Sequence, residues 1–364
     1  MIRVLALCSY PKEAAATRFR LLQYTEPLFR RGIELVVRPM LSSEGFAALY
    51  GPHRMAATRH VLSAVARRLA DLGRFRQFDV ILVQREAMIF GPPAVEQMIR
   101  VARKPLVLDL DDATYVRYRS PTYSPLVNWL KFFGKTDRLI DMAHTVVCGN
   151  AQIAAYVEGR GGRAAVVPTL VDTEVFRPPT ERPQGAPPVV GWVGSHSTYP
   201  FLERILPALS NVAATHPFRL LVVGSGVAAP QIPGLVVDYR PWSLNRELAD
   251  FTELDIGLYP IDENRYGAQW AQGKSGFKAI QYFAAGVPAV VSPVGECATM
   301  GRPGTTHLLA NTLPEWTNGV VRLLDAPELR REMSRAARAH AMATYGLDTA
   351  ADALAAVLNE AAEG

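Results

Sequence analysis

Short runs of consecutive apolar residues alternate along the chain with longer segments in which apolar residues recur every three or four positions. An unbroken apolar run is typical of a strand buried on both faces, and the wider spacing is typical of an amphipathic helix. In the first half, the runs predict strands in RVLALCS (3–9), IELVVRPM (33–40), FDVILVQRE (78–86), PLVLDLDD (105–112), TVVCGN (145–150) and AAVVPT (164–169). Helices are predicted at 18–32, 55–73, 92–103, 125–143 and 151–158.

The same alternation restarts near residue 189. Strands are predicted in VVGWVGS (189–195), FRLLVVGSG (218–226), GLVVDYRP (234–241), DIGLYP (255–260), PAVVSPVG (288–295) and HLLAN (307–311). Helices are predicted near 200–215, 243–252, 314–325, 327–344 and 349–361, and a further helix holds Lys274. Strands separated by helices imply parallel sheets covered on both faces, so we predict an α/β protein with two doubly wound, Rossmann-like domains.

A proline-rich segment separates the two halves. RPPTERPQGAPP, residues 177–188, has five prolines and no periodicity, which is typical of an extended linker. We therefore expect an N-terminal domain over 1–176, a linker over 177–188, a C-terminal domain over 189–346, and a final helix in 347–364 that packs back towards the N-terminal domain. Ligands of doubly wound sheets bind at the carboxyl ends of the strands, which predicts a central cleft faced by both domains.

Composition narrows the function classes. The chain of 364 residues is 49% apolar and 20% charged, which excludes a disordered protein. Its formal net charge of +5 suits an anionic small ligand or an anionic membrane surface, and is no signature of nucleic-acid binding. The apolar run at the start ends at Cys8, too short for a signal-peptide core. Scattered cysteines favour a reducing compartment, so we expect a cytoplasmic protein.

Two basic segments leave peripheral attachment to the inner face of a membrane open. RMAATRHVLSAVARRLADLGRFR (54–76) has six arginines and one acid, Asp71, around an apolar stripe. WLKFFGK (129–135) places Trp129 and two phenylalanines among lysines. Basic and apolar residues together suit a membrane surface, and a core-facing stripe with a solvated basic face suits the same pattern.

Small polar residues follow the first predicted strand of the second half. In GWVGSHST, the strand ends at Gly194, and Ser195, His196 and Ser197 lead into a helix that begins near Pro200. Such a loop presents backbone N–H groups to an anion, and it is equally suited to be a plain helix cap.

The next strand ends in a glycine pair, Gly224 and Gly226, as in a dinucleotide-binding fingerprint. That fingerprint needs a helix directly after the glycines. Pro230 and Pro233 follow instead, and a helix cannot run through them. We therefore interpret the glycine pair as a turn.

Charged residues end three predicted strands of the first half. Asp109, Asp111 and Asp112 in LDLDDATY invite a divalent cation, because hard cations prefer carboxylate oxygens. The alternative is one structural aspartate and two that cap a helix. We favour Asp111 or Asp112 facing the cleft without a metal.

Arginines near other strand ends are further candidates. Arg18 and Arg20 lie two apart, so one of them can bind an anion while the other is solvated. Arg85 lies at the end of another strand, between Gln84 and Glu86, where an ion pair is as reasonable as a ligand contact.

The segment GKSGFKAIQYFAAGVPAVVSPVG (273–295) carries the most specific pattern. It predicts a helix, a Gly-Val-Pro turn and a strand, with Lys274 and Lys278 on one face in the first turns of the helix. A helix N-terminus repels cations, so two lysines there indicate a bound anion. A diphosphate would accept bonds from both lysines and from the N–H groups of Ser275, Gly276 and Phe277, and solvation of one lysine is the alternative.

In order and spacing, GWVGSHST, VVGSG, DIGLYP and this segment resemble the retaining GT-B glycosyltransferases of the group 1, or GT4, family. The resemblance spans nearly the whole chain and implies a GT-B fold whose C-terminal domain binds a nucleotide-diphosphate sugar. The family's Glu-x7-Glu pair falls on Gly273 and Gln281. Gln281 keeps an oxygen acceptor for a ribose hydroxyl, and Gly273 keeps nothing.

The resemblance implies a metal-independent hexosyltransferase without a cofactor, in which Lys274, Lys278, Asp111 and Asp112 serve catalysis. Donor and diphosphate contacts are expected from Gly194, Ser195, His196, Ser197, Ser275, Gly276, Phe277, Gln281 and Arg18, with Arg240 and Trp242 on the base side. The acceptor is a glycan, a lipid-linked or polysaccharide chain, or a small molecule. Loss of both glutamates also suits a non-catalytic binding protein, and the architecture also suits a nucleotide-sugar epimerase or phosphorylase.

Overall fold

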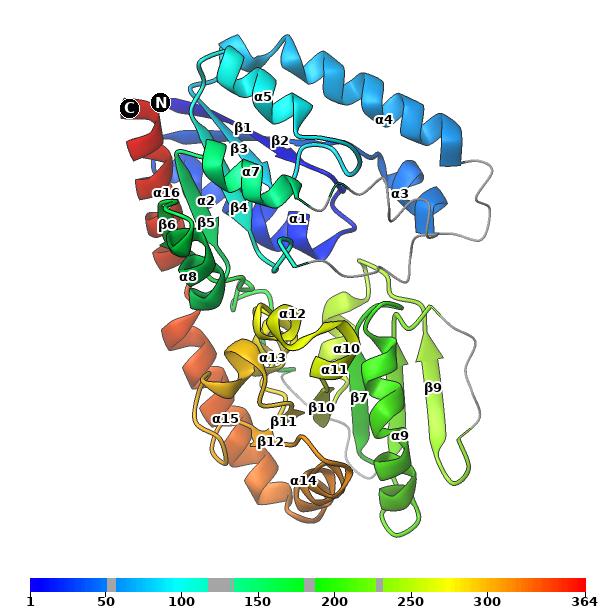
Figure 1. Ribbon diagram of the computed structural model, residues 1–364. Helices are drawn as coiled ribbons and strands as arrows, with labels where there is room; N and C mark the ends of the chain where they lie inside the picture. The colour runs from blue at the N-terminus through cyan, green and yellow to red at the C-terminus, as the bar shows by residue number, and fades with distance from the viewer. Residues whose placement is uncertain (51–56, 117–131, 133, 180–186, 227–231) are drawn as a thin grey trace. The chain divides into compact units, whose positions relative to one another are not determined.

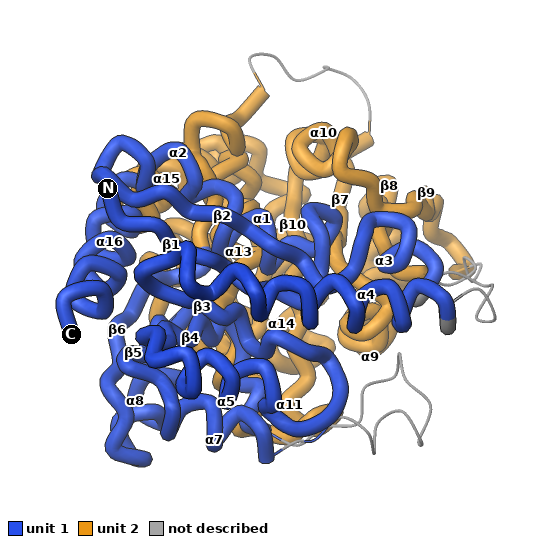
Figure 2. The backbone as a smooth tube through the Cα atoms, turned by 90° about the horizontal axis from the view of Figure 1, so that it is seen from above, with its two compact units in different colours: residues 1–169, 347–364 blue, residues 170–346 orange. Residues whose placement is uncertain are grey.

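The computed structural model describes residues 1–50, 57–116, 132, 134–179, 187–226 and 232–364. The chain divides into two compact units, coloured separately in Figure 2. The first unit comprises Met1–Thr169 together with Leu347–Gly364, and the second comprises Leu170–Gly346. The C-terminal segment therefore belongs to the first unit. Most of the proline-rich linker, residues 180–186, lies outside the described residues, as do Trp129 and Pro230.

The first unit is a parallel sheet with the strand order β2-β1-β3-β4-β5-β6. Its strands are β1 (Ile2–Cys8), β2 (Ile33–Pro39), β3 (Val80–Gln84), β4 (Leu106–Leu110), β5 (Thr145–Cys148) and β6 (Ala164–Val166). Its helices are α1 (Ala15–Arg20), η1 (Leu22–Tyr24), α2 (Thr25–Arg30), α3 (Ser43–Tyr50), α4 (Ala57–Leu72), η3 (Phe75–Gln77), α5 (Ala94–Val101), α7 (Lys135–Met142), α8 (Ala151–Gly159) and α16 (Leu347–Glu363).

Both faces of this sheet are covered. Strands β3, β4 and β5 are buried along their whole length, as their continuous apolar sequences require. Right-handed crossovers put α4, α5, α7 and α8 on one face, and α1 and α2 on the other. The C-terminal helix α16 packs against α2 and contacts strands β1, β3, β4 and β5 (Figure 1).

The second unit has a parallel sheet with the order β12-β11-β10-β7-β8-β9. Its strands are β7 (Val189–Val193), β8 (Arg219–Val223), β9 (Val236–Arg240), β10 (Ile256–Tyr259), β11 (Ala289–Val291) and β12 (Leu308–Leu309). Its helices are α9 (Tyr199–Ala213), α10 (Glu247–Thr252), α11 (Glu263–Tyr266), α12 (Ala268–Gln272), α13 (Phe277–Ala284), η4 (Gly295–Ala298), α14 (Leu313–Asp325) and α15 (Pro327–Thr344).

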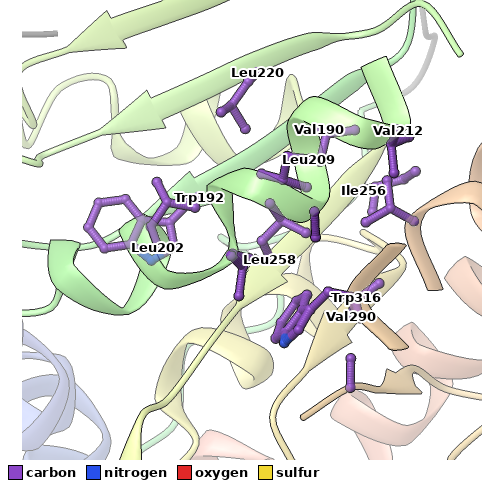
Figure 3. Close-up of a cluster of buried hydrophobic side chains, with 14 of the residues drawn as sticks. Val190, Trp192, Leu202, Leu209, Val212, Leu220, Ile256, Leu258, Val290 and Trp316 are labelled. Atoms are coloured by element: carbon purple, nitrogen blue, oxygen red, sulfur yellow. The ribbon is translucent and has the colours of Figure 1, made fainter. Parts of the chain in front are cut away.

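A core of aromatic and aliphatic side chains fixes this sheet beneath α9 and α14. Trp192 on β7 and Trp316 on α14 are each 2% exposed and belong to one cluster with Leu202, Val290 and their neighbours (Figure 3). Burial of each large apolar side chain contributes roughly 1.5–3 kcal/mol. The core therefore holds the strand ends of the second unit in fixed positions.

Both predicted sheets are present, whereas several helices differ from the prediction, and α3, α11 and α12 were not predicted. The helix predicted over 18–32 is broken, because Leu21 leaves helical geometry (φ −126°, ψ −62°) and a new helix starts with Pro27 in its first turn. The helix predicted to hold Lys274 begins later, at Phe277. None of the described helices is both long and apolar enough to cross a membrane.

Candidate functional site

The second unit has its topological switch point between β7 and β10. From β7 the chain moves outward to β8 and β9, and it then returns to β10 on the other side of β7. The loops that leave β7 and β10 therefore diverge, and such a divergence forms the usual ligand crevice of a doubly wound sheet. Tyr266 joins the two loops, because its hydroxyl donates to the Ser197 carbonyl at 2.9 Å.

The loop after β7 is packed too closely for side chains at its glycines. A Cβ on Gly194 would lie 2.1 Å from the Trp192 ring, and one on Gly224 would lie 2.4 Å from the Gly194 carbonyl oxygen. Gly224 also has a φ of +80°, which favours glycine. The backbone of the predicted anion loop thus runs directly against the turn after β8.

The polar residues of this loop largely bond to one another. The Ser195 N–H donates to Thr198 Oγ1 at 3.1 Å, and the Ser195 and Ser197 hydroxyls lie 2.9 Å apart. The Ser195 N–H is thus bonded within the loop, while Thr198, the N-cap residue of α9, makes no side-chain bond that caps the helix within the described residues. His196 is half-buried, and burial lowers its pKa, so the ring is neutral near pH 7 and can contact a ligand by hydrogen bonding.

The prediction that Lys274 and Lys278 share one helix face is wrong. Gly276 adopts φ +64°, which interrupts the helix, and α13 starts at Phe277. A positive φ favours glycine here, and a Cβ on Gly276 would also require Met300 Cε, 2.5 Å away, to move. Lys274 therefore lies in the loop before α13, and Lys278 lies in its first turn.

Both lysines nevertheless remain within a turn of the start of α13, and they are the only lysines in residues 170–346. Lys274 Nζ lies 3.9 Å from the centroid of the Trp270 ring. Lys278 Nζ donates to Gln281 Oε1 at 2.7 Å and lies 5.3 Å from the Phe251 ring. The N-cap residue of α13 is Gly276, which has no side chain to cap the first N–H groups of the helix. This helix start thus combines two cations with the positive end of a helix dipole.

Gln281 is fully buried and has an unpaired amide. Its oxygen accepts from Lys278, which fixes the orientation of the amide group. Its Nε2 has no hydrogen-bond partner among the described residues. A buried amide N–H without an acceptor costs roughly 1–3 kcal/mol, so it marks a position where a bound group would be stabilised.

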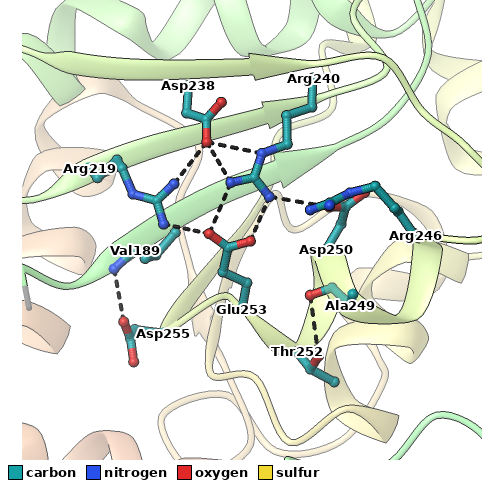
Figure 4. A network of polar contacts seen from close by, with 10 residues as sticks. All are labelled: Val189, Arg219, Asp238, Arg240, Arg246, Ala249, Asp250, Thr252, Glu253 and Asp255. Carbon is teal, nitrogen blue, oxygen red and sulfur yellow. Dashed lines mark hydrogen bonds and ion pairs between the residues drawn. The ribbon is translucent and has the colours of Figure 1, made fainter. Parts of the chain in front are cut away.

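The two residues predicted on the base side, Arg240 and Trp242, lie at the carboxyl end of β9, the edge strand beside β8. Arg240 bonds to the carboxylates of Asp238, Glu253 and Asp250 (Figure 4). These hydrogen bonds raise the pKa of Arg240 and lower that of Glu253 to about 2. Trp242 lies at the Gly224 turn, where its Cβ would be 3.2 Å from a Cβ on that glycine.

In the first unit, the aspartates at the carboxyl end of β4 are bound to arginines. Arg20 is 3% exposed, and its Nε lies 3.1 Å from both oxygens of Asp109. Arg85 Nη2 donates to Asp111 at 2.7 Å and lies 3.6 Å from Asp112. Burial raises the pKa of Asp111, but the Arg85 charge and hydrogen bonds outweigh burial and lower it, so this carboxylate stays ionised.

The other arginine of the predicted pair lies on the surface of this unit. Arg18 donates to the carbonyl oxygens of Lys12 and Glu13 and stacks 5.0 Å from the Phe19 ring. The structure thus brings together Lys274, Lys278, Gln281 and the α13 N-terminus in the second unit, and Arg85, Asp111 and Asp112 in the first.

Sequence reasoning missed two aromatic residues of the second unit. Tyr266 ends α11 and Trp270 lies in α12, and their ring centroids are 4.7 Å apart. Two aromatic residues four positions apart, shortly before Lys274, are the signal that could have been used. Arg85 was among the sequence candidates, but its positive φ of +59°, a strained geometry for a side chain of this size, was not predicted.

Comparison with known proteins agrees with this description. A family model described as glycosyl transferase-like matches residues 203–356. A D-inositol 3-phosphate glycosyltransferase from Acidothermus cellulolyticus is 28% identical over 208 residues, which are 50% of this chain and 44% of the relative. The matched region thus spans less than half the length of that relative.

Solved structures match over nearly the whole chain. A sucrose-phosphate synthase from Thermosynechococcus elongatus has a TM-score of 0.67 at 15% identity and covers 98% of both chains. HepE from Anabaena, in complex with UDP-glucose, has a TM-score of 0.67 at 14% identity and covers 99% of this chain and 100% of its own. At these identities the likeness establishes the fold. Residues 203–356 are thus similar to the glycosyl transferase-like family, and the chain has the GT-B fold of these solved structures.

Proposed function

We propose that the protein is a glycosyltransferase that moves a sugar from a nucleotide-diphosphate sugar to an acceptor hydroxyl, with retention at the anomeric carbon. The acceptor is a glycan, a lipid or a small molecule, and the transferred sugar is a hexose. The glycosyl transferase-like match and the UDP-glucose complex of HepE support this choice of donor.

One observation carries the proposal. The only two lysines in residues 170–346 lie within a turn of the start of α13, whose N-cap residue is a glycine. A cation at a helix N-terminus is unfavourable by about 0.3–1 kcal/mol, whereas each charge-assisted hydrogen bond to a phosphate contributes roughly 1.5–3 kcal/mol. A bound diphosphate therefore makes the interaction of these lysines with their surroundings favourable, although the helix N-terminus alone repels them.

These groups would assist bond cleavage in the donor. When the bond from the anomeric carbon to the β-phosphate oxygen breaks, its electron pair stays on the leaving diphosphate. Lys274, Lys278 and the α13 N–H groups would stabilise the negative charge that develops on the leaving diphosphate. In other transferases a divalent ion stabilises this charge. We therefore propose turnover without a metal.

The remaining candidates take supporting roles. The unpaired Nε2 of Gln281 is suited to donate to a ribose hydroxyl, and the second lone pair of its oxygen can accept from one. In the first unit, the ionised carboxylate of Asp111 and its neighbour Asp112 are suited to orient an acceptor hydroxyl.

A melting screen with nucleotides and nucleotide sugars tests the donor class. A ligand at 100 times its dissociation constant stabilises the folded state by about 2.7 kcal/mol. We expect nucleoside diphosphates and their sugar conjugates to raise the melting temperature, and nucleosides to leave it unchanged. Failure of every nucleotide to stabilise the protein would contradict the proposal.

Turnover separates the transferase from its alternatives. A donor that stabilises the protein is incubated with it in about 5 mM EDTA, roughly a thousandfold excess over protein. Slow release of the sugar under these conditions supports a metal-independent transferase. Loss of turnover in EDTA with recovery in magnesium or manganese would show that a metal is required. Binding without turnover favours the non-catalytic binding protein, for which the replaced glutamates at Gly273 and Gln281 argue.

A further inference from the structure

Helices α4 and α5 expose apolar side chains on one face of the first unit. The two helices contact each other on the same side of the sheet (Figure 1). On α4, Leu62 and Leu69 are 68% and 52% exposed and lie in one stripe with Ala66. On α5, Met98 and Val101 are 45% and 72% exposed, one turn apart. We call these two stripes with their basic neighbours the α4/α5 face.

The α4/α5 face is positively charged. Seven cationic residues with no ion pair among the described residues lie in residues 57–77 and 94–104, namely Arg59, Arg67, Arg74, Arg76, Arg100, Arg103 and Lys104. The acids of the same segments are Asp71 and Glu96, which are 0% and 1% exposed. Asp71 binds Arg38 and Arg68, and Glu96 accepts from the Ala87 N–H. Exposed cations and apolar side chains thus occur here without exposed acids.

The opposite face of the same unit provides a contrast. On α2, Phe29 is 53% exposed, and the neighbouring cations Arg30 and Arg31 pair with Asp348 and Asp352 of α16. That face is therefore closer to neutral, although its apolar exposure is similar.

We infer that the α4/α5 face docks onto an anionic lipid bilayer. The apolar stripes would enter the boundary between headgroups and acyl chains, and the surrounding cations would contact lipid phosphates. Each cation near an anionic surface strengthens binding by about 5-fold, equivalent to about 1 kcal/mol. A nucleic acid would use the same cations but would gain nothing from exposed leucine and methionine, so the apolar stripes favour lipid.

Co-sedimentation of the full chain with vesicles tests this inference. We expect binding to vesicles of phosphatidylglycerol and phosphatidylcholine, and at least about tenfold weaker binding to phosphatidylcholine alone. Half-molar salt should weaken the binding without abolishing it, because the apolar contribution is not screened.

Variants on the two faces make the test specific. Leu62→Ser with Leu69→Ser, and separately Arg100→Gln with Arg103→Gln, should each weaken binding to anionic vesicles by about tenfold or more. The matched control, Leu22→Ser on η1 with Phe29→Ser on α2, should stay within about twofold of the wild type. Circular dichroism checks that each variant is folded. If the leucine variant is unfolded, the charge variant provides the test.

Three outcomes would overturn the inference. The first is absence of wild-type binding to anionic vesicles, and the second is an equal loss in the control variant. The third is binding to duplex DNA that depends on the arginines, together with vesicle binding that does not depend on the leucines.

Discussion

Each unit joins the two loops at its switch point with a side-chain hydrogen bond, and the two points differ in how they hold positive charge. In the first unit, the Ser9 hydroxyl donates to the Glu86 carbonyl at 3.1 Å. In the second, the Tyr266 hydroxyl donates to the Ser197 carbonyl at 2.9 Å. In both units, a side-chain hydroxyl of one loop thus donates to a backbone carbonyl of the other loop at the switch point.

The charges beside these loops are arranged differently. In the first unit, Arg20 and Arg85 are bonded to the carboxylates of Asp109 and Asp111. In the second, Lys274 lies over an aromatic ring and Lys278 donates to a neutral amide oxygen. A buried cation paired with a carboxylate stabilises the fold, whereas lysines beside a helix N-terminus add their attraction for an anion to that of the helix dipole. The same strand topology therefore holds a structural cluster of ion pairs in the first unit and a candidate anion site in the second.

The largest expected effect is on stability in the first unit. Asp109→Ala leaves the buried Arg20 charge uncompensated, which should lower the free energy of unfolding by about 3–5 kcal/mol. Urea denaturation measures this change. Asp141→Ala removes an exposed partner of Arg160 and, as the control, should cost less than about 1 kcal/mol. Similar losses in the two variants would show that the buried pair is not structural.

The second effect is on binding in the second unit. Lys274→Ala and Lys278→Ala should each weaken binding of a nucleoside diphosphate by roughly 1–3 kcal/mol, or about 5- to 150-fold, with the melting temperature of the free protein nearly unchanged. Calorimetry gives the affinities. Arg335→Ala, an exposed cation on α15 of the same unit, is the control and should bind as the wild type does. Unchanged affinity in both lysine variants would remove the proposed site.

The two units should also differ in their response to acid. His307 is fully buried, and burial lowers its pKa from 6.5 to about 4. The unfolded chain therefore takes up the proton first, so stability is present above pH 6.5 and is lost as pH falls towards 4. Between pH 7 and pH 5 the loss should be about 2 kcal/mol.

Hydrogen exchange resolved by segment measures this difference. Exchange in β12 and α15 should accelerate at pH 5, and His307→Leu should remove that acceleration. Equal acceleration in the paired strands of the first unit would contradict the assignment to His307.

The sequence predicts the strands of both units because the strands of a parallel sheet that is covered on both faces have continuous apolar sequences. It does not predict the pairing of Arg20 with Asp109, which are 89 residues apart and meet only after the sheet forms. The turn at Gly276 was also missed, since a glycine inside an apolar helical pattern gives no sign of a positive φ. The lysine pair was chosen for its charge, and its placement at the start of α13 depends on that turn.

The smallest expected effect concerns Gln281. Gln281→Leu removes the amide that Lys278 contacts and the unpaired Nε2, and should weaken donor binding by about 1–2 kcal/mol. Gln281→Glu should change affinity by less than about tenfold, because the new carboxylate repels the diphosphate by about 2 kcal/mol at roughly 7 Å while its hydrogen bonds strengthen. Comparison of ribo- and 2′-deoxyribonucleotides reads out the ribose contact. If the Gln281→Leu variant discriminates between these nucleotides as the wild type does, Gln281 is a packing residue and makes no ribose contact.

The most direct measurement is the affinity of UDP and of uridine for the wild type and for the double variant Lys274→Ala with Lys278→Ala. The proposed site recognises the diphosphate, so the wild type should bind UDP at least about 100-fold more tightly than uridine, as two charge-assisted contacts would require. In the double variant this preference should nearly disappear, while the affinity for uridine stays the same. A double variant that keeps the full preference for UDP would contradict the assignment of the diphosphate to the start of α13.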